Sequence, residues 1–379
     1  MQGGKRHILV MSSWYPTRLD PFLGNFVERF VRLLSSVYEV SVLHTQNDKS
    51  ISKIEVTEDR SKGYHEIIVY YPTGNNAFSK WWNRRRALSK GMKFIEDVDL
   101  IYSHIFMNKI SQFVRAKFHY HCPLLVHEHG SYVFKEAPPR VNQIQKQNVR
   151  RFRLYIKKII AVSPVLRAEM KSTFPTTKID VVPNYVDETL FPLKSSTSKL
   201  IKNFVHISTL DVKSKNPLML LEGFEKALPS LDQESKLTIV SDQCSETWKK
   251  WVTERNLENR ILFVGPLQWD EIGSVLQEND CLIQTSDFET FGIVIAESWL
   301  VGLPVISTSV GIAHELPEFL GLQIKKNDAP DLAEKLIQIQ NQNNSFDAEK
   351  IREHALQFSS DAVRDQLQSL FENYFDQHE

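Results

Sequence analysis

Short apolar runs that end in polar residues or proline recur along the first half of the chain. Such runs are typical of buried parallel strands whose carboxyl ends carry loops. The first run is followed by a loop and then by "NFVERFVRLLSSV", in which apolar residues fall at helical spacing. We therefore expect a Rossmann-like domain over residues 1–190. Its predicted strands lie in "HILVMSS", "YEVSVLH", "DLIYSH", "PLLVHEHG", "KKIIAVSP" and "KIDVVPN".

A second series of apolar runs alternates with helical segments and predicts a second Rossmann-like domain over residues 200–360. Residues 184–200 have little periodicity and form the candidate linker. The final amphipathic helix, within residues 361–379, can pack back on the first domain. The predicted fold class is therefore α/β, with the two domains facing each other across a deep cleft that binds ligands at the carboxyl ends of both sheets. The second series of strands lies in "FVHIST", "SKLTIVSD", "RILFVGP", "DCLIQTS" and "LPVISTS".

The length and composition agree with two domains in the cytosol. A chain of 379 residues is too long for one hydrophobic core. It has no apolar run of bilayer-spanning length, and "MQGGKRHILV" shows no signal-peptide pattern. We expect a cytoplasmic protein, at most peripheral on the inner face of the cytoplasmic membrane. Cys122, Cys244 and Cys281 match no zinc or disulfide spacing and are interpreted as reduced residues in or near the core.

The charge is divided unequally between the halves although the net charge is zero. Residues 1–199 carry 31 Lys and Arg against 17 Asp and Glu, and residues 200–379 carry 15 against 29. The resulting net charges are +14 and −14. A basic half suits an anionic partner, such as a membrane surface, a phospholipid-linked acceptor or nucleic acid. Alternatively, the opposite charges only help the two domains to sit together.

The segment "SDFETFGIVIAES" places Glu289 and Glu297 eight positions apart across a predicted strand-to-helix turn. The helix is expected to end at Gly302 as its C-cap. Free backbone amides of Phe291, Gly292 and Ile293 at the helix start favour an anion such as a diphosphate. Glu297, two turns further on, then suits the hydroxyls of a ribose. Alternatively, Glu289 is only a helix-start acid and Glu297 an exposed polar residue.

Several segments together resemble a known family. "ETFGIVIAE" followed by "GLPVIST" resembles the E-x7-E signature and the downstream G-x-P-V run of retaining GT-B glycosyltransferases of family 4. The resemblance extends in order along almost the whole chain, through "VHEHGS", "VVPNYVDETLF", "LDVKSKNPLMLLEGF" and "RILFVGPLQWDEIGSVLQENDCLIQTS".

The resemblance implies roles for particular residues on the donor side. It implies that Glu289 and the backbone over residues 290–293, which includes Thr290, hold the transferred sugar and the diphosphate. It also implies that Glu297 holds the ribose hydroxyls and that Lys215 contacts the diphosphate. Lys213, two residues away, is a rival for that last role.

In the first domain, Gly24 matches the glycine of the loop under the diphosphate, although an ordinary turn glycine would look the same. The neighbouring Asn25 is placed on the acceptor side. His129 corresponds to the family histidine near the transferred sugar, and His104 is a further acceptor-side candidate. His127, Glu128 and His129 could alternatively cap the sheet edge. They could also suggest a metal, but no further ligands stand at zinc-like spacing, so a metal-independent site is the simpler hypothesis.

The sequence departs from the family pattern at two places. Thr209 stands where the family commonly has an arginine, so one charge-assisted contact to the donor is missing. The stretch "IVSDQ", residues 239–243, lacks the usual glycine-containing turn. Both departures weaken the expectation of full activity.

Residues 77–95 combine aromatic and basic side chains on one predicted helix. Phe78, Trp81, Trp82, Leu88, Met92 and Ile95 fall near helical spacing, with basic residues between them. This composition suits the headgroup region of an anionic membrane. The alternative is a helix that packs its tryptophans on the first sheet and leaves its arginines in solvent.

We therefore expect a retaining hexosyltransferase that uses a nucleotide-diphosphate sugar, needs no metal or other cofactor, and acts on a glycan or lipid-linked acceptor in surface polysaccharide biosynthesis. The alternatives are a GT-B sugar-nucleotide epimerase and a donor-binding protein with impaired catalysis. A nicotinamide-dependent oxidoreductase is disfavoured because no G-x-G-x-x-G follows a predicted strand. No nucleic-acid partner is expected, since the basic half carries no recognisable motif for one.

Overall fold

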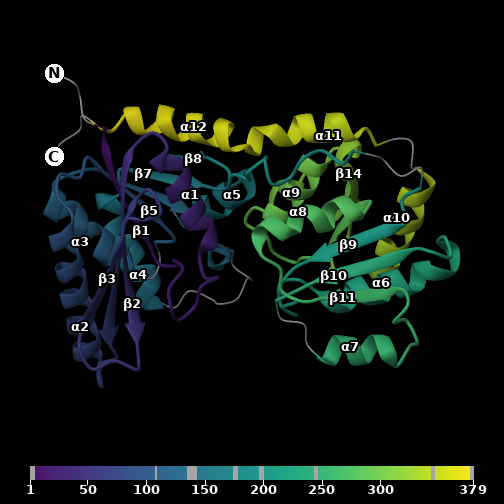
Figure 1. The fold of residues 1–379 in the computed structure, drawn as a ribbon, viewed down its shortest axis with the longest axis horizontal. Coiled ribbons are helices and arrows are strands. Elements are labelled where there is room, and N and C mark those ends of the chain that lie inside the picture. Colours follow the sequence, from purple (N-terminus) through teal and green to yellow (C-terminus); the bar gives the residue numbers. More distant parts are fainter. Residues whose placement is uncertain are drawn as a thin grey trace.

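The chain forms two separate sheets, one in each half. The computed structural model describes residues 5–106, 109–134, 143–173, 178–195, 200–242, 246–342 and 346–375. Helices flank both sheets, and the two halves lie side by side in Figure 1. The predicted pair of Rossmann-like domains facing each other is confirmed.

The first sheet has eight strands in the order β3-β4-β2-β1-β5-β6-β7-β8, all parallel except β3, which pairs antiparallel with β4. The chain fills one side of β1 and then returns to fill the other side from β5, so the strand order reverses between these two strands. Ligands of open α/β sheets bind beside the carboxyl ends of the strands at such a point. The strands are β1 His7–Ser12, β2 Glu39–Asp48, β3 Glu55–Asp59, β4 His65–Pro72, β5 Leu100–His104, β6 Leu124–Glu128, β7 Lys158–Ala161 and β8 Ile179–Val181.

The second sheet has six strands, all parallel, in the order β11-β10-β9-β12-β13-β14. Here the order reverses between β9 and β12, and the loops that follow these two strands carry Lys215 and Glu289. The topology thus brings two residues from distant parts of the chain to one edge. The strands are β9 Asn203–Ile207, β10 Lys236–Val240, β11 Ile261–Val264, β12 Cys281–Gln284, β13 Val305–Thr308 and β14 Gly321–Ile324.

The helices bury their apolar stripes against these sheets. In α1, for example, Val27, Phe30, Val31 and Leu34 are buried at helical spacing. The helices of the first half are α1 Asn25–Ser35, α2 Ala77–Gly91, α3 Ile110–Tyr120, α4 Gln143–Phe152 and α5 Pro164–Thr173. Those that follow are α6 Pro217–Ala227, α7 Glu246–Thr253, α8 Trp269–Glu278, α9 Ile293–Val301, α10 Ala329–Asn341, α11 Ala348–Ala355 and α12 Ser360–Glu372.

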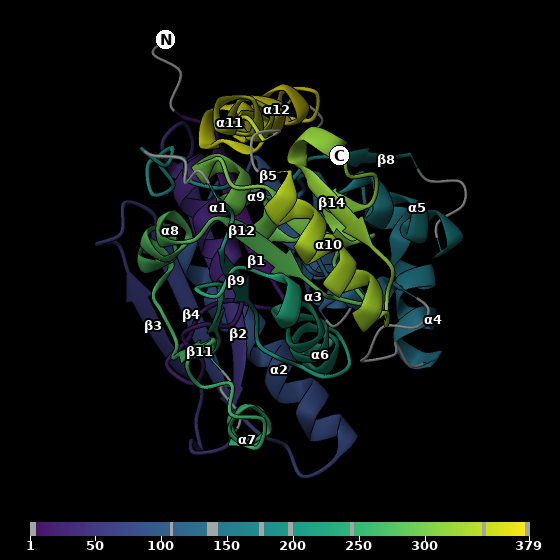
Figure 2. The ribbon, with the colours of Figure 1, turned by 90° about the vertical axis from the view of Figure 1, so that its right-hand side faces the viewer.

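The last helix, α12, returns to the first half. Figures 1 and 2 show α11 and α12 running along one side of the molecule. Val363, Leu367 and Phe371, spaced four residues apart, are fully buried within the core of the first half. The Phe371 ring meets the ring of Tyr102 on β5 at a centroid distance of 5.0 Å. The C-terminal helix therefore completes the core of the first half.

Two chain crossings join the halves, and they are bonded to each other. The amide of Val186 donates to the carbonyl of Phe358 at 2.8 Å, and Val186 pairs with Ser359 in an isolated parallel bridge. The carboxylate of Glu188 accepts bonds of 2.9 Å from the amide and the hydroxyl of Ser360. The outgoing and returning segments thus form one connected strip between the sheets.

All of the predicted strands named above are present, and helix α9 ends at Gly302 in the left-handed conformation (φ 88°) that its predicted C-cap role requires. Three strands, β3, β4 and β14, were not predicted. β3 is short and largely exposed, so it lacks a buried run. Cys122 and Cys281 are buried free thiols, as predicted, whereas Cys244 lies outside the described residues. None of the described helices combines the length and the apolar character needed to cross a bilayer.

Candidate active site

A cleft of about 1220 Å³ lies between the halves. Its first wall includes Asn25 and Arg29 of α1 together with His129, which follows β6. Its second wall includes Glu289 and the start of α9. The carboxyl ends of both sheets supply these loops, so the cleft lies where the topology predicts a ligand.

Glu289 and Lys215 meet at the strand-order reversal of the second sheet. The Lys215 ammonium donates a short hydrogen bond to Glu289 Oε1. The same oxygen accepts bonds from Gln284 Nε2 at 2.8 Å and from Ser286 Oγ at 2.9 Å. Glu289 Oε2 has no hydrogen-bond partner within the described chain. One oxygen thus anchors the carboxylate while the other stays available to a ligand in the cleft.

The beginning of α9 presents backbone amides to the cleft. Gly292 is the N-cap and adopts φ 84°, a left-handed conformation that an L side chain rarely takes. Residues 289–294 all line the cleft. Within the described residues, the amides of Phe291, Gly292 and Ile293 donate to no backbone or side-chain acceptor. Unbonded amides at a helix start, with an ammonium nearby, are suited to an anion.

Glu297 is not an exposed face residue, because its side chain is almost completely buried at 2% exposure. Its Oε1 accepts a 3.0 Å bond from Trp269 Nε1 and lies 3.6 Å from Arg29 Nη1 of the opposite half. The Arg29 guanidinium also stacks over the Trp269 ring, 3.6 Å from its centroid. Burial raises the pKa of the Glu297 carboxyl, and the charge of Arg29 opposes that rise.

His129 lines the first wall, whereas His104 lies behind it and is fully buried. His129 Nδ1 is 2.9 Å from Asn184 Oδ1, and His129 Nε2 is 2.9 Å from His104 Nδ1. Burial holds the pKa of both imidazoles well below the usual value, so both are neutral. The consistent assignment has His129 Nδ1–H donating to Asn184 and His104 Nδ1–H donating to His129. The structure thus makes His104 a support for His129 and does not place it at the cleft surface.

His104, His127 and His129 lie close enough to suggest a metal, with ring nitrogens within 4.8 Å of one another. Their nitrogens are largely engaged, however. His127 contacts the Tyr102 hydroxyl at 2.5 Å and the Val182 carbonyl at 2.8 Å. His104 Nε2 is the one ring nitrogen of this trio without a partner in the described chain. The arrangement is that of a hydrogen-bonded support beneath the cleft wall.

The remaining predicted residues are divided between the cleft and its supports. Asn25 lines the cleft, but Gly24 is buried behind it with φ 74°. A Cβ at Gly24 would lie 2.5 Å from the backbone carbonyl carbon of Trp14, so the loop packs too tightly there for a side chain. Lys215 does not line the cleft itself, but it is bonded to Glu289, which does. Lys213 and Thr209 are exposed, and neither lines the cleft.

The sequence analysis did not assign a role to Arg29, Asn184 and Trp269, which line the cleft, or to Ser163, which is buried and joins the two halves. The Ser163 hydroxyl donates a 2.6 Å bond to the carbonyl of Thr290, across the two halves. Asn184 could have been found, because it follows the end of a predicted strand, where site residues are expected. The sequence analysis placed it only in the linker. Arg29 and Trp269 sit within helices that look ordinary in the sequence, so only the packing of the two halves identifies them.

Comparisons with known proteins agree with this geometry. The family model described as Glycosyltransferase Family 4 matches residues 23–190, and the model described as Glycosyl transferases group 1 matches residues 194–357. Over 178 residues the chain is 28% identical to N-acetyl-alpha-D-glucosaminyl L-malate synthase of Bacillus anthracis. The aligned residues make up 44% of this chain and 45% of that protein. The chain thus spans less than half the length of this curated relative.

Solved structures share the fold over nearly the full length. A sucrose-phosphate synthase from Thermosynechococcus elongatus superimposes with a TM-score of 0.77 at 16% identity, covering 97% of this chain and 99% of that one. Anabaena HepE in complex with UDP-glucose gives a TM-score of 0.69 at 19% identity, with the same coverage. At these identities the likeness concerns the fold alone.

Proposed function

The chain belongs to glycosyltransferase family 4, the group 1 glycosyl transferases, and on that premise we propose that it is a retaining hexosyltransferase. Its donor is a nucleotide-diphosphate sugar, and its acceptor is a hydroxyl of a glycan or a lipid-linked molecule in surface polysaccharide biosynthesis. The observation that carries the proposal is the meeting of Lys215 and Glu289 beside the unbonded amides that begin α9.

The donor lies along the second wall in this proposal. The diphosphate takes the amides of Phe291, Gly292 and Ile293, with the Lys215 ammonium beside it. Glu289 Oε2, which is free of protein partners in the described chain, accepts hydroxyls of the transferred sugar. Glu297 accepts the ribose hydroxyls, with Trp269 holding its other oxygen in place.

Transfer requires the bond between the sugar and the diphosphate to break. Negative charge then grows on the departing phosphate oxygens, and a fixed ammonium and helix-start amides stabilise that charge more strongly than they stabilise the bound donor. The chain's own groups supply this stabilisation, so the proposed chemistry is metal-independent. Contacts between the halves, such as that of Ser163 with Thr290, close the cleft and exclude water that would hydrolyse the donor.

The acceptor side is the first wall. His129 and Asn184 present polar groups there, and Asn25 lies at the start of α1 on the same wall. Because both nitrogens of His129 are engaged, a sugar hydroxyl must take the place of His104 or Asn184 as its partner. His104 then acts by positioning His129.

A donor-binding protein with impaired catalysis is the second candidate, and Thr209 favours it. Thr209 supplies no positive charge where the family commonly has an arginine. Arg29 and Arg32 of α1 line the same cleft from the opposite wall, which supports a donor site that draws its guanidinium groups from the first half. Turnover distinguishes the two candidates.

A titration of nucleotide-diphosphate sugars by thermal shift tests the proposal, beginning with UDP-glucose because HepE binds it. Lys215→Gln should abolish stabilisation by the hit, and the matched control Lys213→Gln should retain it, since the Lys213 side chain is exposed and does not line the cleft. Nuclear magnetic resonance of the products with an acceptor then reports the anomeric configuration.

Transfer with retention supports the proposal. Release of an altered free sugar without an acceptor would instead identify an epimerase, and binding without turnover would favour the impaired protein. Equal loss of binding in both lysine variants would remove the role assigned to Lys215.

A further inference from the structure

Helix α2 divides the aromatic segment of residues 77–95 into two parts. Leu88, Met92 and Ile95 are buried in the core of the first half. Phe78, Trp81 and Trp82 are not: their side chains are 70%, 53% and 46% exposed. The alternative, in which the tryptophans pack on the first sheet, is therefore wrong. The three rings lie together in one cluster, with centroids 5.9 to 6.3 Å apart.

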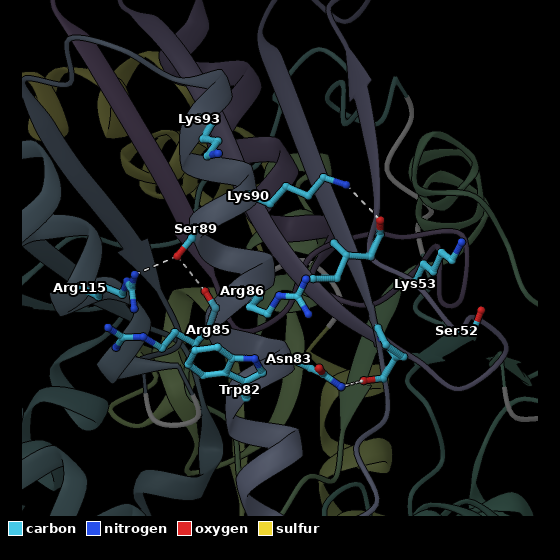
Figure 3. A pocket seen from close by; sticks show the side chains of 12 residues that line it. Ser52, Lys53, Trp82, Asn83, Arg85, Arg86, Ser89, Lys90, Lys93 and Arg115 are labelled. Atoms are coloured by element: carbon cyan, nitrogen blue, oxygen red, sulfur yellow. Dashed lines mark hydrogen bonds between the residues drawn. The ribbon is translucent and has the colours of Figure 1, made fainter.

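A basic pocket of about 800 Å³ lies beside this aromatic cluster, between α2 and the segment that precedes β3 (Figure 3). Trp82 forms part of its wall. None of its twelve lining residues is acidic, and half are basic: Lys53, Arg85, Arg86, Lys90, Lys93 and Arg115. None of these six forms a salt bridge within the described chain. The pocket therefore concentrates positive charge that the described protein leaves uncompensated.

Hydrogen bonds hold part of the pocket in place. Ser89 Oγ accepts a 2.9 Å bond from Arg115 Nη2, and Lys90 Nζ donates to the carbonyl of Ile54 at 3.1 Å (Figure 3). The second terminal nitrogen of Arg115, Nη1, is buried and has no partner in the described chain. Burial lowers the pKa of Arg115, and the neighbouring charge of Arg85 lowers it further. These groups repel one another, so a bound anion would relieve an existing cost.

The opposite side of α2 has the same character. A second hollow of about 1150 Å³ is lined by Trp81, Lys80 and Arg151 among others, again without an acidic residue. The exposed rings of Phe118 and Tyr155 lie at its edge, 5.1 Å apart. Basic hollows thus flank α2 on both sides, and exposed aromatic rings accompany both.

We propose that the α2 face, meaning the basic pocket together with Phe78, Trp81 and Trp82, docks the protein on an anionic phospholipid bilayer. Headgroup phosphates enter the pocket, and the aromatic rings lie at the level of the headgroups, where amphipathic rings are most stable. Charge complementarity selects the partner, and the aromatic cluster favours a bilayer over a free phosphate, which could not cover it. The pocket shares no lining residue with the interdomain cleft, so this proposal stands apart from the donor site.

Sedimentation with vesicles tests the proposal without any sugar nucleotide. The full chain should bind vesicles of phosphatidylglycerol and phosphatidylcholine, and should not bind phosphatidylcholine alone. The pair Arg86→Gln and Lys93→Gln removes two exposed charges that have no partner in the described chain. It should weaken binding by roughly fivefold for each charge. Trp81→Ser with Trp82→Ser should remove the binding that persists at high salt.

The matched control is Lys226→Gln with Lys236→Gln, which removes two exposed charges from the second half. It should bind vesicles like the unmodified chain, and all variants should keep their melting temperatures. Equal binding to neutral vesicles, or unchanged binding by the Arg86 and Lys93 pair, would overturn the proposal. So would displacement by free glycerol phosphate at concentrations near those of the vesicle lipid. Binding of double-stranded DNA in preference to vesicles, lost in the same pair, would reassign the face to nucleic acid.

Discussion

Arg29 of α1 and Glu297 of α9 form an ion pair that joins the two halves of the molecule, with Arg29 Nη1 3.6 Å from Glu297 Oε1. Trp269 contacts both, since its ring lies under the guanidinium and its indole nitrogen donates to the carboxylate. The acid assigned to the donor ribose is therefore oriented by a residue of the opposite half, and the charge of that residue lowers its pKa against the effect of burial. Donor binding and the closed arrangement of the halves should then be coupled.

Replacing Arg29 should make donor binding more sensitive to acid. Burial raises the pKa of Glu297, and the positive charge of Arg29 lowers it. Arg29→Gln removes that charge, so the Glu297 carboxyl should become protonated at a higher pH. Donor binding should then be lost at a higher pH as the pH falls. Donor affinity measured by calorimetry across pH should show a midpoint at higher pH than in the unmodified chain.

Arg32→Gln is the matched control, because Arg32 lines the same cleft but pairs with Glu28 and not with Glu297. Its midpoint should stay where it is. Identical shifts in both variants would mean that general charge in the cleft, and not the Arg29 contact, governs Glu297.

Adding one methyl group at Gly292 should weaken donor binding. The left-handed backbone there would cost an alanine about 1–2 kcal/mol, and its Cβ would lie 2.9 Å from Ile295 Cδ1. The Ile295 side chain can turn aside to relieve the contact, but the left-handed backbone strain at residue 292 remains. We expect that strain to shift the start of α9 and with it the amides proposed to hold the diphosphate. Thermal shift with the donor should show reduced stabilisation for Gly292→Ala.

Gly63→Ala is the control that separates the effect of backbone strain on stability from the effect of a displaced helix start on donor binding. Gly63 has nearly the same φ of 82°, but nothing lies within 4 Å of its added Cβ, and it does not line the cleft. It should lose similar intrinsic stability and keep the full donor response. A donor response lost equally in both variants would argue against the proposed diphosphate contact.

Glu128 should contribute a distinctive pH dependence to stability. Burial raises its pKa from 4.5 to about 7, although the amides of His129 and Gly130 both donate to it. The folded protein thus holds this proton more tightly than the unfolded chain, so the contribution of Glu128 to the free energy of unfolding falls as pH rises from 4.5 to about 7. The fall is at most about 3 kcal/mol.

Urea unfolding of Glu128→Gln and of the unmodified chain, compared at several pH values, measures this contribution. The difference is needed because the buried histidines act in the opposite direction: their lowered pKa values make stability rise with pH near 6.5. A difference that does not change across this pH range would show that Glu128 is ionised throughout.

Removing the Phe371 side chain should destabilise the protein by about 3–5 kcal/mol, because it is fully buried against the first half. Leu356→Ala, at a position that is 41% exposed, should change stability by less than about 0.5 kcal/mol. Urea unfolding measures both. A small effect of Phe371→Ala would mean that the core of the first half forms without α12.

The sequence was most informative where structure depends on neighbours in the chain. The turn from β12 to α9 has a buried strand, a left-handed glycine and a glycine C-cap, all of which are visible over a short stretch. The meeting of Lys215 with Glu289 was also within reach, because parallel strands place their following loops at one edge.

Sequence reasoning failed where the answer depended on how separate elements pack. The pairing of Arg29 with Glu297 requires the relative placement of two domains, which no local pattern encodes. His104 ends a strand buried on both faces, so alternation could not tell that it lies behind His129. In α2 the helical spacing was correct, but the buried residues of the helix begin only at Ala87, which leaves the earlier aromatic residues outside the core.

The strip formed by Val186 and Glu188 with residues 358–360 has a mechanical consequence. Two chain segments that are bonded to each other restrict how the halves can move. We expect the halves to rotate apart about the axis through both segments, and we expect rotation about other axes and translation to be resisted. Each opening must therefore break the same contacts, those of Arg29 with Glu297 and of Ser163 with Thr290, and each closing must restore them in the same register.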